Sequence, residues 1–126
     1  FSTARDVARV YQMLLNGGEI DGQRYLSKET CQLFTTEISK ISRRGLGFDK
    51  PDADDPKKGN CAPAAPAEVY GHTGFTGTCA WVDPMNELVY VFLSNRIYPD
   101  VTNRKLNQLH IRERIQGAIY DAMKKK

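Results

Sequence analysis

The chain has 126 residues, of which 40% are hydrophobic and 26% are charged, and this composition is typical of one globular domain. Its longest uninterrupted apolar run, residues 88–93, is far shorter than the roughly 18 residues that span a bilayer, so we expect no membrane span. The net charge is only +3 and the basic residues are scattered along the chain, which argues against nucleic-acid binding.

The cysteines and histidines do not form a metal-binding pattern. Cys31, Cys61 and Cys79 contain no C-x-x-C pair, and neither His72 nor His110 lies at zinc-ligand spacing. We therefore expect no metal and no cofactor. The odd number of cysteines permits at most one internal disulfide and leaves the redox compartment open. We interpret all three as buried apolar residues without a nucleophilic role.

Two helices are predicted in the first third of the chain. Thr3 and Asp6 stand in capping-box positions, apolar residues follow at helical spacing, and Gly17 with Gly18 ends the first helix. Ser27 is the predicted cap of a second helix over about residues 28–34. That helix would place two residues on one side, Cys31 and Phe34.

A strand and a long loop follow. Gly45 and Gly47 alternate with Leu46 and Phe48, which predicts a short strand over residues 44–48. Residues 50–67 contain four prolines among Asp, Lys and Ala, with almost nothing to bury, and predict a long Pro-rich surface loop within the domain. Loops of this length in a compact domain are either functional or mobile.

The last half of the chain predicts a hairpin and a terminal helix. Residues 78–82 and 87–94 are β-rich runs joined by a four-residue turn, 83–86, with proline in its second position. Both alternating sets of the second run are apolar, so we expect that strand to be covered on both faces. A helix over about residues 103–123 would cover one face of the sheet with Ile115, Ala118, Ile119 and Ala122. The predicted fold class is α+β, an antiparallel sheet flanked by helices.

The segment before the hairpin contains three glycines, in the run Gly71-His72-Thr73-Gly74-Phe75-Thr76-Gly77. Strands normally avoid glycine, so this run suggests that another backbone or a ligand approaches closely. Together with Trp81-Val82-Asp83-Pro84 and Ser94-Asn95-Arg96, it resembles the third motif of the serine β-lactamase and penicillin-binding-protein superfamily. It is most similar to the class C-like branch, in which His-Thr-Gly often replaces Lys-Thr-Gly. Residues 1–6, 13–18 and 25–27 also resemble that branch.

The resemblance implies a role for each residue of the motif. His72 would help to set the charge and the proton transfer around a nucleophile, and Thr73 would contact the carboxylate or polar end of the substrate. The backbone N–H of Phe75 would be one of two donors to the oxyanion. We therefore expect His72, Thr73 and Phe75 to be catalytic, and Gly74, which leaves room for the substrate, and Thr76 to bind substrate.

Each of these residues also has a plainer interpretation. A lone histidine on a strand, such as His72, is usually structural, and Thr73 and Thr76 would otherwise be ordinary strand threonines. Trp81 is interpreted as packing, and His110 has only a structural interpretation, as a residue of the terminal helix.

The sequence departs from the family at the nucleophile. No serine of the chain is followed three residues later by lysine, as the family's Ser-x-x-Lys requires; the serines are Ser2, Ser27, Ser39, Ser42 and Ser94. Residues 25–27 meet the second motif, Tyr-x-Ser, formally, but we interpret that match as coincidental. The chain begins with Phe1 rather than Met. We therefore expect residues 1–126 to be a single partial domain, the C-terminal portion of the β-lactamase/transpeptidase-like fold, and to be inactive alone.

The expected parent is a serine hydrolase of β-lactamase, D,D-peptidase or esterase type that acts on a small-molecule or peptide substrate through an acyl-serine. Residues 96–116 also resemble proteins in which such a domain follows a family-three glycoside hydrolase of the β-N-acetylglucosaminidase type. The family implies a periplasmic or cell-surface location. The expected partners are the N-terminal part of the same protein or a second copy, paired along the open edge of the strand over 87–94. One alternative is a non-catalytic module that binds cell-wall peptide or has a regulatory role. The other is a complete small structural domain.

Overall fold

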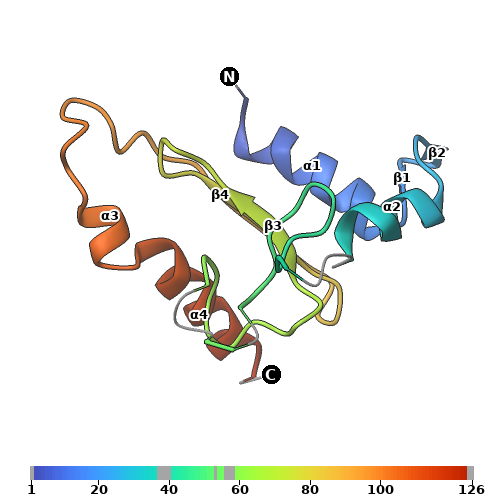
Figure 1. The fold of residues 1–126 in the computed structure, drawn as a ribbon. Coiled ribbons are helices and arrows are strands. Elements are labelled where there is room, and N and C mark those ends of the chain that lie inside the picture. The colour runs from blue at the N-terminus through green and yellow to red at the C-terminus, as the bar shows by residue number, and fades with distance from the viewer. Residues whose placement is uncertain (1, 37–40, 53, 56–58, 125–126) are drawn as a thin grey trace.

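The computed structural model describes residues 2–36, 41–52, 54–55 and 59–124. Its elements follow the order α1 (Ala4–Leu15), β1 (Glu19–Ile20), β2 (Gln23–Arg24), α2 (Lys28–Thr35), β3 (Tyr70–Thr73), β4 (Cys79–Asp83), β5 (Leu88–Phe92), α3 (Lys105–Gln108) and α4 (Ile111–Met123). Strands β3, β4 and β5 form an antiparallel sheet in that order, and β1 pairs with β2 separately. The sheet lies between α1 and α4 (Figure 1), which confirms the α+β class.

The two predicted helix starts are confirmed by their caps. Thr3 Oγ1 accepts a hydrogen bond from the Asp6 N–H at 3.2 Å, and Ser27 Oγ accepts one from the Thr30 N–H at 3.1 Å. Each cap satisfies a backbone donor that the first turn of a helix leaves unpaired. On α2, Cys31 is buried as predicted, whereas Phe34 remains 42% exposed.

The predicted strand over residues 44–48 is wrong. The Gly45 N–H donates to Phe48 O at 3.0 Å, which folds this segment back on itself instead of extending it. A Cβ on Gly45 would also clash with Phe34 O, at a distance of 2.6 Å, because the segment runs close to the end of α2. Only Asp49, directly after it, pairs with the sheet, through an isolated bridge to Gly71.

The terminal helix differs from the prediction in two ways. It is divided into α3 and α4, and His110 between them has a φ of 49°. The buried residues of α4 are Arg112, Gln116 and Tyr120. Of the residues predicted to cover the sheet, Ile119 packs against the core, whereas Ile115, Ala118 and Ala122 are exposed.

Hydrogen bonds explain why polar residues occupy the buried face of α4. Gln116 Oε1 accepts from the Ala62 N–H at 2.8 Å, and the Tyr120 hydroxyl donates to Asp83 Oδ2 at 2.9 Å. Burial of a polar group is tolerated when it is paired in this way. The helix therefore holds the loop before β3 and the turn between β4 and β5 in place.

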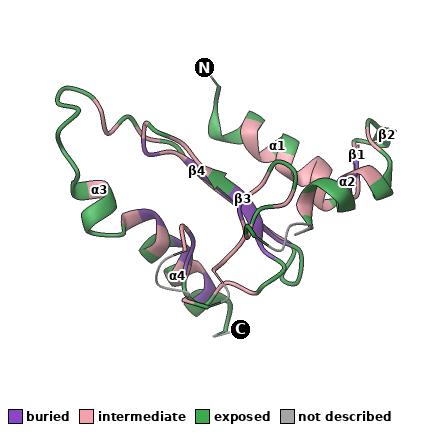
Figure 2. Cartoon of the chain, viewed as in Figure 1, coloured by how far each residue is buried: buried purple, intermediate pink, exposed green. Residues whose placement is uncertain are grey.

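The core lies mainly on β4 and on the loop that precedes β3. Its buried cluster consists of Cys61, Val69, Cys79, Trp81 and Tyr90, and Figure 2 shows burial concentrated along the sheet. The described part of residues 50–67 contains no helix or strand, and Cys61 within it is only 2% exposed, so part of this segment belongs to the core. In β5, Tyr90 is buried and the other four residues are half-buried.

Candidate functional site

Strand β3 places the His-Thr-Gly segment at one edge of the sheet. Its partner is β4, with His72 opposite Ala80 and Thr73 opposite Cys79. A side chain on Gly71 would clash with the carbonyl oxygen of Ala80 and lie 2.6 Å from the ring of Trp81. Close approach of another backbone, one of the two explanations for the glycines of this segment, is therefore confirmed at this position.

The imidazole of His72 is exposed and has a defined tautomer. Its Nδ1 lies 2.6 Å from the carbonyl oxygen of Thr73, which can only accept a hydrogen bond. Nδ1 therefore carries a proton, and in the neutral ring the lone pair is on Nε2. In this arrangement Nε2 is the ring nitrogen left to exchange a proton with another group.

A tight turn over residues 74–77 follows β3. The Gly77 N–H donates to Gly74 O at 2.9 Å, and the Gly74 N–H donates to Thr78 O at 2.8 Å. The two central residues of the turn, Phe75 and Thr76, keep their N–H groups free: no residue in the described part of the chain accepts from them. Backbone donors at a turn that have no acceptor among the neighbouring groups are suited to bind an anion.

The glycine before Phe75 packs against its own hairpin. A side chain on Gly74 would clash with the Thr78 hydroxyl. The space that this glycine leaves is therefore occupied by a neighbouring side chain of the same hairpin.

A cleft of about 250 Å³ lies between β3 and α1. It brings together three of the predicted site residues, His72, Thr73 and Gly74, with six others: Val7, Tyr11, Thr78, Cys79, Ala80 and Leu93. Phe75 and Thr76 do not line it, and the Phe75 side chain is 71% exposed. Burial raises the pKa of Tyr11, so its phenol remains a neutral O–H group at this wall of the cleft.

The cleft residues of α1 were not identified from the sequence. Val7 and Tyr11 belong to the apolar stripe of the first helix, and a helical stripe normally indicates packing. No local signal distinguishes a residue that packs on the sheet from one that borders a cleft at its edge.

Comparison with known proteins gives the relationship of the chain. The Beta-lactamase family matches residues 1–113. The chain belongs to the beta-lactamase family. It is 34% identical over 107 residues to a "Putative D-alanyl-D-alanine carboxypeptidase" of Escherichia coli O157:H7. Proteins of the same name from Escherichia coli K12 and Salmonella agona are each 33% identical to it over 107 residues. Each match covers 85% of the chain and 24% of the relative.

Membership of the beta-lactamase family confirms the superfamily that the His-Thr-Gly segment resembles. The chain nevertheless spans only about a quarter of the length of these relatives. In the described part of the chain, no helix is both long enough and apolar enough to cross a membrane.

Several other side chains of this beta-lactamase family chain could suggest a nucleophile. Those of Ser27 and Tyr25 have structural roles. Ser27 is the cap of α2, and the Tyr25 hydroxyl donates to Gln23 Oε1 at 3.1 Å. The three cysteines are free thiols and are buried, and burial raises the pKa of Cys61 and of Cys79 to about 11. A thiol with such a pKa is not a nucleophile near neutral pH. The described residues contain no group of three or more side chains that would hold a metal.

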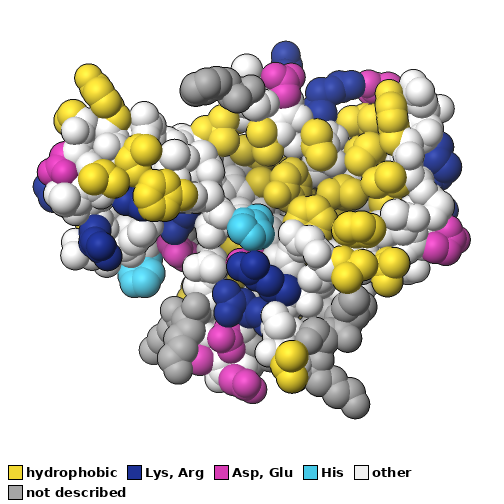
Figure 3. Space-filling model, turned by 45° about the horizontal axis from the view of Figure 1, so that its top comes forward, with side chains coloured by type: hydrophobic (Ala, Val, Ile, Leu, Met, Phe, Trp, Pro, Cys, Tyr) yellow, Lys and Arg dark blue, Asp and Glu magenta, His cyan; other side chains and the backbone are white. Residues whose placement is uncertain are grey.

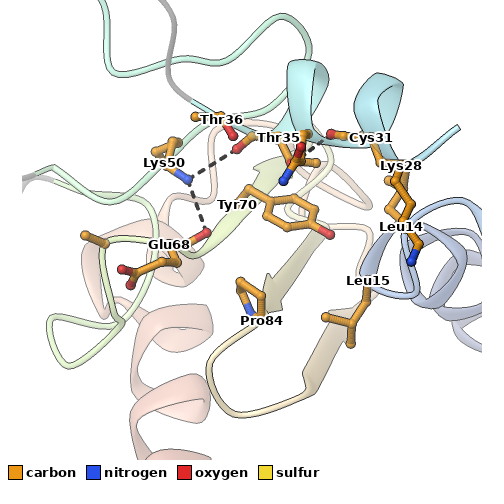
Figure 4. A pocket seen from close by; sticks show the side chains of 13 residues that line it. Leu14, Leu15, Lys28, Cys31, Thr35, Thr36, Lys50, Glu68, Tyr70 and Pro84 are labelled. Atoms are coloured by element: carbon orange, nitrogen blue, oxygen red, sulfur yellow. Dashed lines mark hydrogen bonds between the residues drawn. The ribbon is translucent and has the colours of Figure 1, made fainter.

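A larger pocket of about 550 Å³ lies elsewhere, between the end of α1, helix α2 and the start of β3 (Figure 4). Lys50 Nζ donates to Thr35 O at 3.2 Å and to Glu68 O at 3.1 Å, and the ring of Tyr70 forms part of the wall. This pocket shares no lining residue with the His72 cleft. Because the Lys50 ammonium joins the end of α2 to the segment before β3, the size of this pocket alone assigns it no chemistry.

Proposed function

We propose that this chain is the C-terminal part of one serine hydrolase domain of the beta-lactamase family, which cleaves an amide or ester through an acyl-serine. The names of the relatives favour D-alanyl-D-alanine carboxypeptidase activity. The observation that carries the proposal is the free N–H of Phe75, in a turn directly after the strand that bears the His72 imidazole. We call the longer polypeptide that would contain this chain the parent protein.

The proposed reaction assigns a role to each motif residue. The Phe75 N–H would donate to the oxyanion of the tetrahedral intermediate, and one such donor is worth about 3 kcal/mol of barrier. His72 would exchange a proton with the reacting groups through Nε2. The Thr73 hydroxyl would contact the polar end of the substrate. Gly74 and Thr76 would bind substrate at the same edge of the strand.

The nucleophile would come from elsewhere in the parent protein. The chain contains no Ser-x-x-Lys, and acyl transfer needs nucleophile, base and oxyanion donors together. The chain alone should therefore be inactive. The family and its cell-wall substrates favour a periplasmic or cell-surface location, and the likeness of residues 96–116 favours a parent that also carries a family-three glycoside hydrolase domain.

The test is to acylate the parent protein and the isolated chain in parallel. The parent protein should form a covalent adduct with a fluorescent penicillin and release D-alanine from a peptide ending in D-alanyl-D-alanine, whereas residues 1–126 alone should do neither. Intact-mass spectrometry would detect any adduct. An adduct on a serine of the isolated chain, or a parent protein without either activity, would contradict the proposal.

A second candidate is a module that binds cell-wall peptide without cleaving it. The free N–H groups of Phe75 and Thr76 favour it, because they can bind an anionic group without any nucleophile. Sequencing the parent gene upstream of Phe1 separates the two proposals. Ser-x-x-Lys followed by Tyr-x-Asn or Tyr-x-Ser supports the hydrolase, and their absence supports the binding module.

The open edge of β5 bears on how the chain assembles. In the described part of the chain, β5 is the last strand of its sheet and is apolar along its whole length, and unpaired edges of this kind pair readily with other strands. We propose that the isolated chain forms a two-fold dimer through this edge, and that the N-terminal part of the parent protein occupies the edge in the full-length molecule. Light scattering at micromolar concentration should give a dimer for the chain alone. A monomer with protected amides along β5 would contradict this.

A further inference from the structure

Arg96, which follows β5, is attached to the turn that carries Phe75. Its backbone N–H donates to Thr76 O at 2.9 Å, and its Nε–H donates to Phe75 O at 2.9 Å. Its guanidinium carbon lies 4.9 Å from the centre of the Phe75 ring, within the range of a cation–π interaction. One residue therefore binds the carbonyls of both central residues of the turn.

The contact between the turn and the end of β5 is close. The Ser94 hydroxyl donates to Thr76 O at 3.3 Å, which adds a second donor to that carbonyl. A side chain on Gly77 would lie 2.6 Å from Ser94 Oγ and 3.4 Å from Arg96 Cβ, and Gly77 also has a φ of +95°. Glycine is thus required here by both the backbone conformation and the nearby residues 94 and 96.

These contacts hold the backbone on both sides of Phe75. A peptide unit is planar, so holding its carbonyl also orients its N–H. The Phe75 N–H belongs to the peptide unit whose carbonyl, Gly74 O, is held by the Gly77 N–H. The next peptide unit is held at Phe75 O by Arg96. With both flanking units held, the N–H of Phe75 has little freedom to rotate.

We infer that Arg96 is a positioning residue, which holds the turn that carries the Phe75 N–H through the hydrogen bond from its Nε to Phe75 O. This inference rests on the proposed function. A preorganised donor stabilises the transition state because it needs no reorientation during the reaction. Loss of the Arg96 contact should therefore slow the reaction without weakening substrate binding.

Two substitutions separate the hydrogen bond from the charge. In Arg96→Gln the amide nitrogen stands at the same distance along the side chain as the arginine Nε, so it retains a donor to Phe75 O and removes the charge. In Arg96→Lys the charge remains, but a methylene replaces Nε. The third variant, Arg96→Ala, removes both groups. The control is Arg114→Ala on α4, because Arg114 is exposed and its side chain has no hydrogen bond in the described structure.

The variants are measured in the parent protein, as kcat and KM for D-alanine release and as the rate of acylation by penicillin. Arg96→Gln and Arg114→Ala should stay within about threefold of wild type. Arg96→Lys and Arg96→Ala should lose about tenfold to a hundredfold in kcat, a fraction of the loss on removal of a whole donor, with KM changed less than twofold. Retained activity in Arg96→Lys with loss in Arg96→Gln would overturn the inference, because the charge would then be the active feature. Unchanged kcat in all three variants would overturn it too.

A second measurement keeps this inference separate from the proposed function. The backbone amide resonance of Phe75 in labelled protein should shift in Arg96→Lys and Arg96→Ala and stay in place in Arg96→Gln and Arg114→Ala. A wild-type parent without turnover or acylation would contradict the proposed function, and the resonance would still decide whether Arg96 holds the turn. An unshifted Phe75 resonance in every variant would overturn the inference. It would also be overturned if the Phe75 resonance shifted only in variants whose whole spectrum showed unfolding.

Discussion

Substitution of His72 in the parent protein tests the proposed site most directly. The imidazole is exposed, and among the described residues its one hydrogen bond joins Nδ1 to the carbonyl of the next residue, Thr73. Removal of a surface group with so few contacts changes the free energy of unfolding by about 0.5 kcal/mol or less. A positioned acid–base group contributes about 10² to 10⁴ in rate, and 10² corresponds to about 2.7 kcal/mol of barrier. The two effects are therefore well separated in size.

His72→Asn is the informative variant, with His72→Ala beside it. The asparagine amide nitrogen occupies the place of Nδ1 and can still donate to Thr73 O, but nothing replaces Nε2 as a base. Both variants should lose about 10² or more in kcat/KM for D-alanine release, while the melting temperature stays within about 2 °C of wild type. If His72→Asn keeps kcat/KM within about tenfold, or if the loss follows the melting temperature, His72 is a structural residue and the proposed role is wrong.

Three further predictions concern the chain itself. Burial raises the pKa of Cys61 and of Cys79 from the ordinary 9.0 to about 11 in the folded state. The buried thiols therefore stabilise the fold fully below about pH 9, and this stabilisation, on the order of 2 kcal/mol each, is lost as the pH rises toward 11. Urea unfolding at pH 8 and pH 10.5 should show this fall, and replacing both thiols by Ala should flatten it; an equal fall without the thiols contradicts it. Tyr120→Phe removes the hydroxyl that donates to the buried Asp83, and should cost about 1.5–3 kcal/mol in thermal unfolding; no change would mean that the turn satisfies the carboxylate alone. Gly71→Ala should separate β3 from β4 and cost about 3 kcal/mol or more; retained amide protection in β3 would refute the clash.

The parts of the fold that could be predicted depend on interactions between near neighbours. The side chains of Thr3 and Ser27 each accept a hydrogen bond from the N–H three residues later, so a few consecutive residues determine where each helix starts. The hairpin turn is similar, because Asp83 Oδ1 accepts from the N–H groups of Met85 and Asn86. Local chemistry of this kind is visible in the sequence before any tertiary contact is known.

The parts that could not be predicted depend on partners far away in the chain. The polar face of α4 is buried because Gln116 meets a backbone N–H 54 residues earlier and Tyr120 meets a carboxylate 37 residues earlier. Periodicity of apolar residues cannot anticipate such pairs, so of the four residues that it selected only Ile119 packs against the core. The candidate site shows the same limit: the motif residues were identified, whereas the contact from Arg96 to Phe75, across 21 residues, carries no local signal.

The surface around helix α1 bears on both the assembly and the chemistry of the chain. Helix α1 contacts β4 and β5, yet none of its residues is buried and Val10 is 55% exposed. Figure 3 shows hydrophobic side chains gathered in a broad patch on this side of the molecule. A helix in a folded protein gains most of its stability by burying its apolar face, so a surface of this kind favours a covering partner. Because Val7 and Tyr11 of α1 also border the His72 cleft, we propose that the polypeptide that covers this face in the parent protein brings the nucleophile to the same cleft.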